Sequence, residues 1–405
     1  MENIFSDRLI HSAECFSRDQ LEKRRVKHGF AHLNKVEAFA WDLEIYGHLQ
    51  QHLGDAVVLK GGAATQLYLP VELQRTSVDI DIICTAAIQE FDRVTEEILS
   101  RLSRDRKLLR FRKYVPTRPT PGLELSTYFV TTPSVCTPAE NFGSQDPSIQ
   151  QIKVDVLHDH IDNHKYLPKG TATFALDVAF EPGVFTADSL FGDKLLTLAT
   201  TTVGIPDSRA SDRCKQLYDL DKLLGQGLLT KSSEMQQAFD STMECQRKIP
   251  GREQFTADEA LADTIRFLGD ATEMDVGNDP LGLWNALQGF QTNFVRQSAR
   301  RTREGWAIGM EQLRFVAQSL RAQKSGGKED PLTIYKNAVA LETQLSGEGA
   351  DNKGEIIRAS QAKLLEFARS QDATLGKKLR GKSPARIFWY LAEAENLGDI
   401  GHAVQ

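Results

Sequence analysis

Two aspartates one residue apart, Asp79 and Asp81, are the first residues whose type and spacing suggest chemistry. They lie in residues 78–84, where acidic and apolar residues alternate as in a β-strand, so both carboxylates point to the same face. Neighbouring carboxylates suit Mg²⁺, which prefers oxygen ligands and often bridges protein carboxylates and substrate phosphates. The pattern predicts a site that handles a phosphorylated substrate.

A glycine turn precedes this aspartate pair. Lys60, Gly61 and Gly62 follow a short apolar strand at 56–59 and lead into a predicted helix at 63–68. Glycine lets backbone N–H groups approach a phosphate without a Cβ in the way, and a helix N-terminus behind it favours negative charge. Both parts of a phosphoryl-transfer site are therefore expected within residues 60–82.

A third acid is expected from a later strand. Asp155 lies in an alternating frame at 152–156, and Lys153 shares its face. If that face also carries Asp79 and Asp81, three carboxylates could hold two metal ions, with the lysine near phosphate oxygens. The alternative is that Asp79 and Asp81 are polar residues on an exposed edge strand. We favour the functional interpretation because the pair follows a strand, glycine turn and helix in sequence.

The elements that must position these residues follow an α+β pattern. Helices are predicted at 17–53, 87–102, 186–200 and 209–224, and strands at 56–59, 78–84, 107–115, 123–131, 151–157 and 173–180. Beyond residue 230 the strand signals fade and only helical patterns remain. We therefore predict an α/β domain with N-terminal helices at 1–230, which carries the expected site, and an all-helical accessory domain at 231–405.

Composition indicates a folded protein. The chain has 405 residues, 40% of them hydrophobic and 26% charged, which excludes disordered and collagen-like classes. Its 49 Lys and Arg against 55 Asp and Glu give a net charge of −6, so any nucleic-acid contact must come from local basic patches. The five cysteines form no C-x-x-C pair and the N-terminus lacks a secretory pattern, so we expect a cytoplasmic protein with reduced thiols and no membrane contact.

Two further segments carry clusters of charged or metal-binding side chains. Residues 101–118 form a basic stretch with Phe111 and Tyr114, which fits either RNA or a solvated strand edge equally well. Its basic residues are Arg101, Arg104, Arg106, Lys107, Arg110, Arg112, Lys113 and Arg118. Residues 158–164 contain three histidines and two aspartates, but no cysteine pair completes a zinc site, and surface residues are the simpler interpretation.

The spacing of these motifs resembles the nucleotidyltransferase toxins of the AbiEii and MenT type, a branch of the polymerase-β-like superfamily. Their pattern, K-G-G followed by R-x-S-x-D-x-D, is met by the glycine turn and by Arg75, Ser77, Asp79 and Asp81. Their K-x-D strand resembles Lys153 and Asp155, and their helical lysine before leucines resembles Lys194. The final R-x-K-D-x-Y-D motif resembles residues 213–219, where Asp219 is retained and Gln216 replaces the first aspartate.

The resemblance covers about residues 30–230 and implies a polymerase-β-like fold and transfer of a nucleoside monophosphate from an NTP, with release of pyrophosphate. It implies that Asp79 and Asp81 hold Mg²⁺, with two ions at the site, and that Asp155 binds the second ion and helps deprotonate the acceptor hydroxyl. Lys194 and Asp219 are further catalytic candidates. The implied nucleotide-binding residues are Lys60, Gly61, Gly62, Arg75, Ser77 and Lys153.

The resemblance also suggests an acceptor and a partner. We expect the acceptor to be RNA, most specifically the tRNA 3′ end, and the protein to act as the toxin of a toxin–antitoxin or phage-defence pair with a cognate antitoxin. The alternatives are a protein or small-molecule acceptor, or a regulatory subunit that binds nucleotide without catalysis. Gln216 slightly favours the regulatory alternative, because glutamine carries no negative charge, and the three retained acids oppose it.

Overall fold

The computed structural model describes residues 8–102, 110–115, 122–137, 140, 149–274, 279–347 and 352–404. Its described strands form one mixed sheet in the order β3-β4-β5-β2-β1-β7-β6. They are β1 (Val57–Lys60), β2 (Asp79–Cys84), β3 (Arg110–Tyr114), β4 (Leu125–Pro133), β5 (Ile149–His158), β6 (His164–Tyr166) and β7 (Gly183–Phe185). This confirms the expected α+β class with a mixed sheet.

Alternation along β4 and β5 gives the sheet one covered face and one open face. Tyr128 and Val130 are buried, whereas Thr127 and Phe129, which alternate with them, are only half-buried. On the covered face, Phe91 of α4 (Ile88–Leu102) contacts Tyr128, with ring centroids 5.1 Å apart. The open face is the one that carries the predicted site residues.

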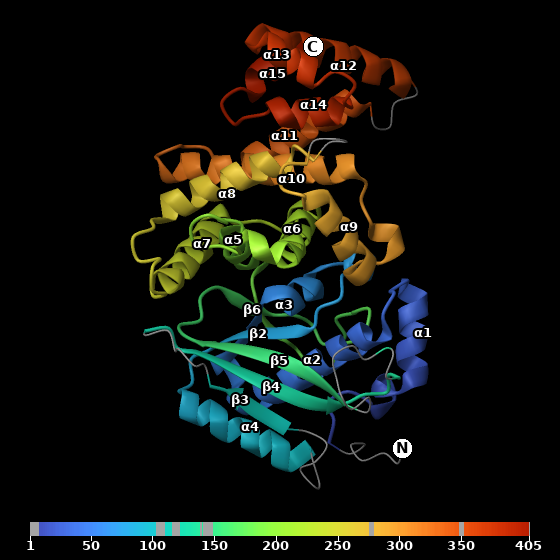
Figure 1. Ribbon diagram of the computed structural model, residues 1–405, viewed down its shortest axis with the longest axis vertical. Helices are drawn as coiled ribbons and strands as arrows, with labels where there is room; N and C mark the ends of the chain where they lie inside the picture. The colour runs from blue at the N-terminus through green and yellow to red at the C-terminus, as the bar shows by residue number, and fades with distance from the viewer. Residues whose placement is uncertain are drawn as a thin grey trace.

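Helices before the middle of the chain cover the sheet or follow its strands. Besides α4 they are α1 (Arg18–His28), α2 (Leu33–Leu53) and α3 (Gly61–Tyr68). The long helix α2 is almost completely buried from Val36 to Leu49 and packs against β1, β2 and β5. In Figure 1 the sheet with α2 and α4 occupies the lower half of the molecule, and the later helices stack above it towards the C-terminus.

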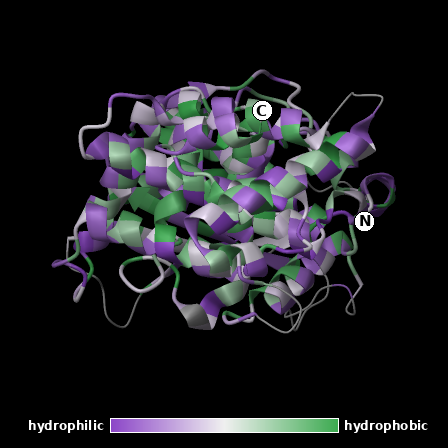
Figure 2. Ribbon diagram, turned by 90° about the horizontal axis from the view of Figure 1, so that it is seen from above, coloured by the Kyte–Doolittle hydropathy of each residue, from purple (hydrophilic) through white to green (hydrophobic). Residues whose placement is uncertain are grey.

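The part of the chain after residue 230 contains helices and no strand among its described residues, as the sequence predicts. Two more helices, α5 (Ala187–Leu196) and α6 (Ala210–Gly225), precede residue 230. The helices after it are α7 (Ser232–Arg247), α8 (Ala257–Ala271), α9 (Leu283–Phe294), α10 (Arg303–Lys324), α11 (Pro331–Ser346), α12 (Lys353–Gln371), α13 (Ala373–Lys378), α14 (Pro384–Leu391) and α15 (Leu397–Val404). Figure 2 shows hydrophobic and hydrophilic residues interleaved along them, as expected for helices that bury one face.

Helix α7 packs extensively against α5, across the boundary predicted near residue 230. The division into domains at 1–230 and 231–405 therefore stays a prediction. In the described part of the chain, no helix combines the length and the apolar character that crossing a bilayer requires.

One expected strand is wrong. Residues 173–180 form a turn, in which Leu176 N donates to Thr173 Oγ1, with an isolated bridge between Ala172 and Asp177. The segment is apolar because it packs into the core, where Phe174 stacks on Phe39, and not because it joins a ladder. The sheet is instead extended by β6 and β7, which are too short to give an alternating pattern.

A buried carboxylate holds the N-terminal segment on α2. Glu44 accepts hydrogen bonds from the backbone N–H groups of Ile10 and His11 and from the His11 and His48 rings. Since His11 Nε2 accepts from Ala179 N, its Nδ1 carries the proton donated to Glu44. Burial opposes ionisation of Glu44, but these hydrogen bonds outweigh it and lower its pKa to about 2.

We expect Glu44→Gln to lower the free energy of unfolding by about 3 kcal/mol at pH 7, because it leaves buried donors without their carboxylate. A depressed pKa contributes stability that is present above the ordinary value of 4.5 and is lost as the pH falls towards 2. The Tm difference from the wild type should therefore shrink between pH 5 and pH 3. Glu72→Gln, at an exposed position, is the control and should leave Tm unchanged. If the Tm difference between Glu44→Gln and the wild type did not depend on pH, the ionised Glu44 carboxylate would not be its cause.

Candidate active site

The strand register brings the three predicted carboxylates together. Asp81 pairs with Asp155 across the parallel β2–β5 ladder, and Asp79 pairs with Lys153. Lys60, at the end of β1, pairs with Asp81 from the other side. Because residues in register share a face of the sheet, Asp79, Asp81 and Asp155 form one carboxylate row on the open face.

Asp81 occupies the middle of the carboxylate row, between Lys60 and Asp155 in the sheet, and is half-buried. Burial, followed by the charges of Asp155 and Asp79, raises its pKa to about 6, although Lys60 and Lys194 oppose the shift. On α2, Asp42 is fully buried and neither of its carboxylate oxygens has a hydrogen-bond partner. Burial, with Asp79 and Asp81 adding to it, raises the pKa of Asp42 well above its ordinary value.

Both oxygens of Asp155 are already engaged. Thr127 Oγ1, from β4, donates to Oδ1 at 2.7 Å, and Lys153 pairs with Oδ2. Lys153 is exposed enough to move, with 43% of its side chain accessible. Displacement of Lys153 would free one oxygen of Asp155 for another partner.

The glycine turn fits closely against the carboxylate row. Gly61 has φ +70°, and a Cβ there would overlap the carboxylate of Asp81. A Cβ on Gly62 would lie 2.8 Å from Ser77 Oγ and 2.9 Å from Arg75 Nη2. Helix α3 begins at Gly61 and has no side-chain cap, so its first N–H groups can bind an anion.

A buried ion network lies behind the turn. Arg75 donates to both oxygens of Asp219, at 2.8 and 2.6 Å, and Lys194 Nζ lies 2.9 Å from Asp219 Oδ2. Burial opposes ionisation of Asp219, but Arg75 and Lys194 outweigh it and lower its pKa. Lys194 also donates to Gln216 Oε1 at 3.0 Å, so Gln216 takes part in the same network as an uncharged acceptor.

The smaller of two cavities at the carboxylate row has a volume of about 170 Å³ and lies towards the beginning of β2 and β5. Its basic residues are Arg75, Lys153, Arg209 and Lys215, and Gly62, Ser77, Gln216 and Phe294 also line it. Arg209 and Lys215 both pair with Asp212, at 2.7 and 3.2 Å. Phe294 is fixed over the cavity because its carbonyl accepts from Thr76 N at 2.9 Å. The lining suits a phosphate chain.

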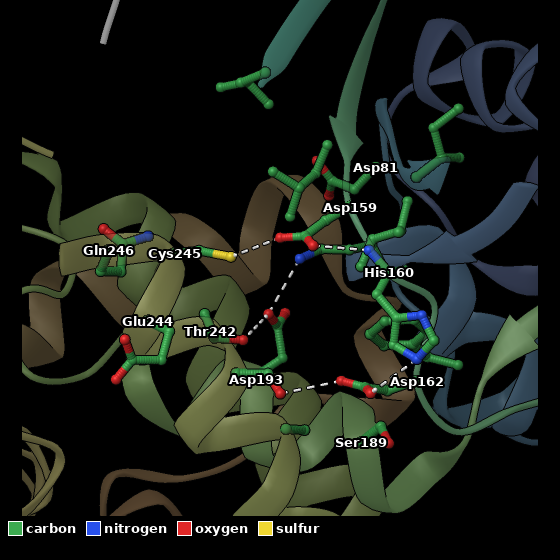
Figure 3. A pocket seen from close by; sticks show the side chains of 18 of the residues that line it. Asp81, Asp159, His160, Asp162, Ser189, Asp193, Thr242, Glu244, Cys245 and Gln246 are labelled. Atoms are coloured by element: carbon green, nitrogen blue, oxygen red, sulfur yellow. Dashed lines mark hydrogen bonds and ion pairs between the residues drawn. The ribbon is translucent and has the colours of Figure 1, made fainter. Parts of the chain in front are cut away.

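The larger cavity has a volume of about 510 Å³ and lies on the other side, towards the ends of β2 and β5. Figure 3 shows Asp193 facing Thr242 and Asp159 facing Cys245, so that α5 and the loop after β5 meet α7 across it. Lys60 Nζ donates to Asp193 at 3.1 Å. Among the residues that the structure describes, the two cavities share only Asp81 and Asp155.

The structure brings most sequence-predicted residues to this site. Asp79, Asp81, Asp155, Lys153, Arg75, Ser77 and Gly62 line the smaller cavity, Lys60 lines the larger one, and Gly61 supports Asp81. Lys194 and Asp219 line neither cavity and lie within the buried ion network. Sequence reasoning missed Thr127, Arg209, Lys215, Phe294 and the α7 residues. Of these, only Lys215 could have been found from the sequence, because it is the lysine of the motif at 213–219.

Of the basic stretch at 101–118, the described members on β3 occupy both faces of the sheet. Arg112 pairs with Phe129, in the row of Lys153 and Asp79, and so belongs to the open face. Lys113 points to the covered face, where it pairs with Asp92 of α4. Arg104, Arg106, Lys107 and Arg118 lie outside the described residues.

The carboxylate row offers the kind of ligands that a divalent cation prefers. In the described part of the chain, no group of three or more His, Cys, Asp or Glu side chains forms a ready-made metal site. The carboxylate row nevertheless concentrates negative charge around Asp81, whose pKa is raised, and all its donors are oxygens. These residues fit Mg²⁺ in the way that it is usually bound, by a few carboxylates completed by substrate phosphates.

Gly61→Ala should abolish most activity, because the added Cβ displaces Asp81; a shift of about 1 Å can cost roughly 100-fold in rate. Gly54→Ala is a matched control, since Gly54 also has a positive φ, of +56°, but no atom lies within 4 Å of its added Cβ. Alanine is strained at a positive φ in both variants, so the Tm of both should fall. Equal activity in the two variants would contradict the role given to the turn.

Comparison with known proteins assigns the family. The family model "Nucleotidyl transferase AbiEii toxin, Type IV TA system" matches residues 46–289, more than half of the chain. The solved structure of MenT4, a nucleotidyltransferase toxin from Mycobacterium tuberculosis, is 13% identical, with a TM-score of 0.38, over 76% of this chain and 98% of that chain. No curated protein sequence matched. The chain therefore belongs to the AbiEii family of nucleotidyltransferase toxins of type IV toxin–antitoxin systems.

Proposed function

We propose that this nucleotidyltransferase uses Mg²⁺ to transfer a nucleoside monophosphate from an NTP to a hydroxyl of an RNA, most specifically at the tRNA 3′ end. The observation that carries the proposal is the carboxylate row, which lies between a glycine turn and two cavities that share Asp81 and Asp155. Binding and charge stabilisation supply most of the catalysis in such reactions, so no nucleophilic side chain is required.

The triphosphate is assigned to the smaller cavity. The N–H groups at the start of α3 and the hydroxyl of Ser77 offer donors there, and Arg209 and Lys215 can exchange Asp212 for phosphate oxygens. Lys194 and Asp219 contribute by positioning Arg75 and Gln216, because they lie behind these residues and line neither cavity. Asp79 and Asp81 would hold Mg²⁺, which supplies charge neutralisation when bound.

Asp155 is the proposed base. Lys153 must leave it, and an arriving phosphate offers the lysine an alternative partner in the same cavity. The freed carboxylate oxygen then accepts the proton of the acceptor hydroxyl, while Thr127 keeps the other oxygen in place. The hydroxyl oxygen forms its bond to the α-phosphorus, and the bond from that phosphorus to the bridging oxygen of pyrophosphate breaks.

Support for an RNA acceptor comes from the open face of β3 and β4. Arg112 lies over the ring of Phe129, 5.3 Å from its centroid, and Tyr114 packs edge-on against the same ring. Half of the Tyr114 surface is exposed. Cationic and aromatic side chains side by side suit the phosphates and unstacked bases of single-stranded RNA, and this surface is continuous with the carboxylate row through the sheet register.

The activity is tested by incubating the purified protein with each α-labelled NTP, Mg²⁺ and total tRNA. We expect label on tRNA with the wild type and a loss of about 100-fold or more with Asp81→Asn, which removes a charge at the reacting phosphate. Glu329→Gln, at an exposed position before α11, should keep full activity. In cells, the wild type should arrest growth and Asp81→Asn should not, and a cognate antitoxin should relieve the arrest.

Other results identify the alternatives. Label on cell protein or on an added aminosugar would move the acceptor away from RNA. Metal-dependent binding of NTP without pyrophosphate release, under all acceptor conditions, would overturn the proposed transfer and indicate a regulatory nucleotide-binding protein.

The RNA surface is tested by a pair of neighbouring substitutions. Arg112→Ala should raise the KM for RNA about 10-fold and reduce the slope of log affinity against log salt by about 1, because one phosphate contact is lost. Lys113→Ala removes the same charge from the same strand but from the covered face, so it should leave both quantities nearly unchanged. The KM for NTP should not change in either variant. Equal effects of the two substitutions on RNA binding would exclude this surface.

A further inference from the structure

The positions of the two cavities restrict where the acceptor can enter. In phosphoryl transfer, the attacking and leaving oxygens lie roughly in line through the phosphorus. The smaller cavity is lined by four basic side chains and by Gly62 of the glycine turn, and so takes the leaving pyrophosphate. The larger cavity lies beyond Asp81 and Asp155 in the opposite direction along β2 and β5, and the attacking hydroxyl must therefore come from it.

The floor of the larger cavity is apolar. Leu125, Leu157 and Ile83 are in register on three adjacent strands, one row beyond Thr127, Asp155 and Asp81. Phe185 and Ala238 add to this apolar lining. Half of the Leu125 surface is exposed, so the floor opens onto the same face as Tyr114 and Phe129. A flat uncharged group can pack on such a floor.

The walls of the larger cavity offer hydrogen-bond acceptors more than donors. Beyond the shared aspartates, its carboxylates are Asp159, Asp162, Asp193 and Glu244, its lysines are Lys60 and Lys248, and its other polar side chains are His160, Ser189, Ser241, Thr242, Cys245 and Gln246. Ser241, Thr242 and Cys245 each donate to one of these carboxylates, which keep further lone pairs free to accept. Lys60 is held by Asp193, and Lys248 lies 3.8 Å from Asp159. Carboxylates repel phosphates but accept hydrogen bonds from amino and ring N–H groups. The walls therefore suit a neutral group rich in N–H donors.

We propose that the larger cavity holds the terminal nucleoside of the acceptor RNA, with a preference for a base that carries an exocyclic amino group. The base packs on the row of Ile83, Leu157 and Leu125, and its N–H groups face the carboxylates. The terminal hydroxyl then gives its proton to Asp155 and bonds to the α-phosphorus as pyrophosphate leaves into the smaller cavity. The inference rests on the proposed transfer to RNA and adds the acceptor site and its base preference.

The first test compares acceptors. Oligoribonucleotides of one length and sequence, ending in A, C, G or U, are used with the wild type at saturating NTP. We expect kcat/KM for ends in A, C or G to exceed that for U by about 10-fold or more, as expected when hydrogen bonds to a base edge are matched or lost. Equal use of all four ends, or a preference for a cationic aminosugar over every oligonucleotide, would overturn the assignment.

The second test narrows the cavity from α7. Cys245→Phe places a ring in the larger cavity and should raise the KM for the oligonucleotide at least 10-fold, with the KM for NTP unchanged. Ser233→Phe adds the same bulk at an exposed position of α7 that does not line the cavity, and it should behave as the wild type. Glu244→Gln, a change of one surface carboxylate that should not affect folding, should weaken the preference for amino-bearing ends.

These measurements separate the two proposals. If the wild type transfers no label to any RNA, whether or not it binds NTP, the proposed function itself is wrong. Transfer that persists with unchanged acceptor KM in Cys245→Phe would leave the function standing and exclude the cavity as the acceptor site. A rise in the KM for NTP alone would show that the larger cavity binds the incoming nucleotide, which would also overturn the inference.

Discussion

The repulsion among three carboxylates on adjacent strand positions is the constraint on which the rest of this structure depends. Asp79, Asp81 and Asp155 are held together by the register of β2 and β5, not by attraction between them. Lys60 of the neighbouring strand β1 and Lys153 of β5 itself reduce the cost, and the glycine turn leaves room for the carboxylate of Asp81. Burial, followed by the charges of Asp155 and Asp79, raises the pKa of Asp81 even with these lysines nearby. Such a site is poised to gain stability from a cation and a substrate, and it is less stable without them.

The buried ion network explains how this family motif tolerates Gln216. Two cations, Arg75 and Lys194, share the single carboxylate of Asp219, and Gln216 contributes a neutral oxygen where an aspartate would add a second negative charge. The network therefore retains an excess of positive charge directly behind the cavity that we assign to the triphosphate. An anionic substrate can use this excess charge, whereas a second carboxylate would have neutralised it.

Local patterns predicted the elements, but not how distant residues meet. The alternation around Asp79 and Asp155 was enough to place two strands and their shared face, and helical spacing located α2, α4, α5 and α6. Pattern alone could not show that Phe174 is buried by packing and not by pairing, so a strand was wrongly expected there. Nor could it place Phe294 and Thr242, because each reaches the site through contacts between elements far apart in sequence. The helices after residue 230 thus line both cavities with residues that no sequence motif predicted.

Parallel pairing of β2 with β5 also links assembly of the site to the order in which the chain is synthesised. The elements α4, β3 and β4 intervene between the two strands, and α7 and α9, which wall the cavities, come later still. A chain emerging from the ribosome carries its first two aspartates long before Asp155 and these helices can join them. The cell that makes this toxin is therefore not exposed to a complete site until synthesis has passed α9, and a partner that recognises the earlier part of the chain has that interval in which to bind.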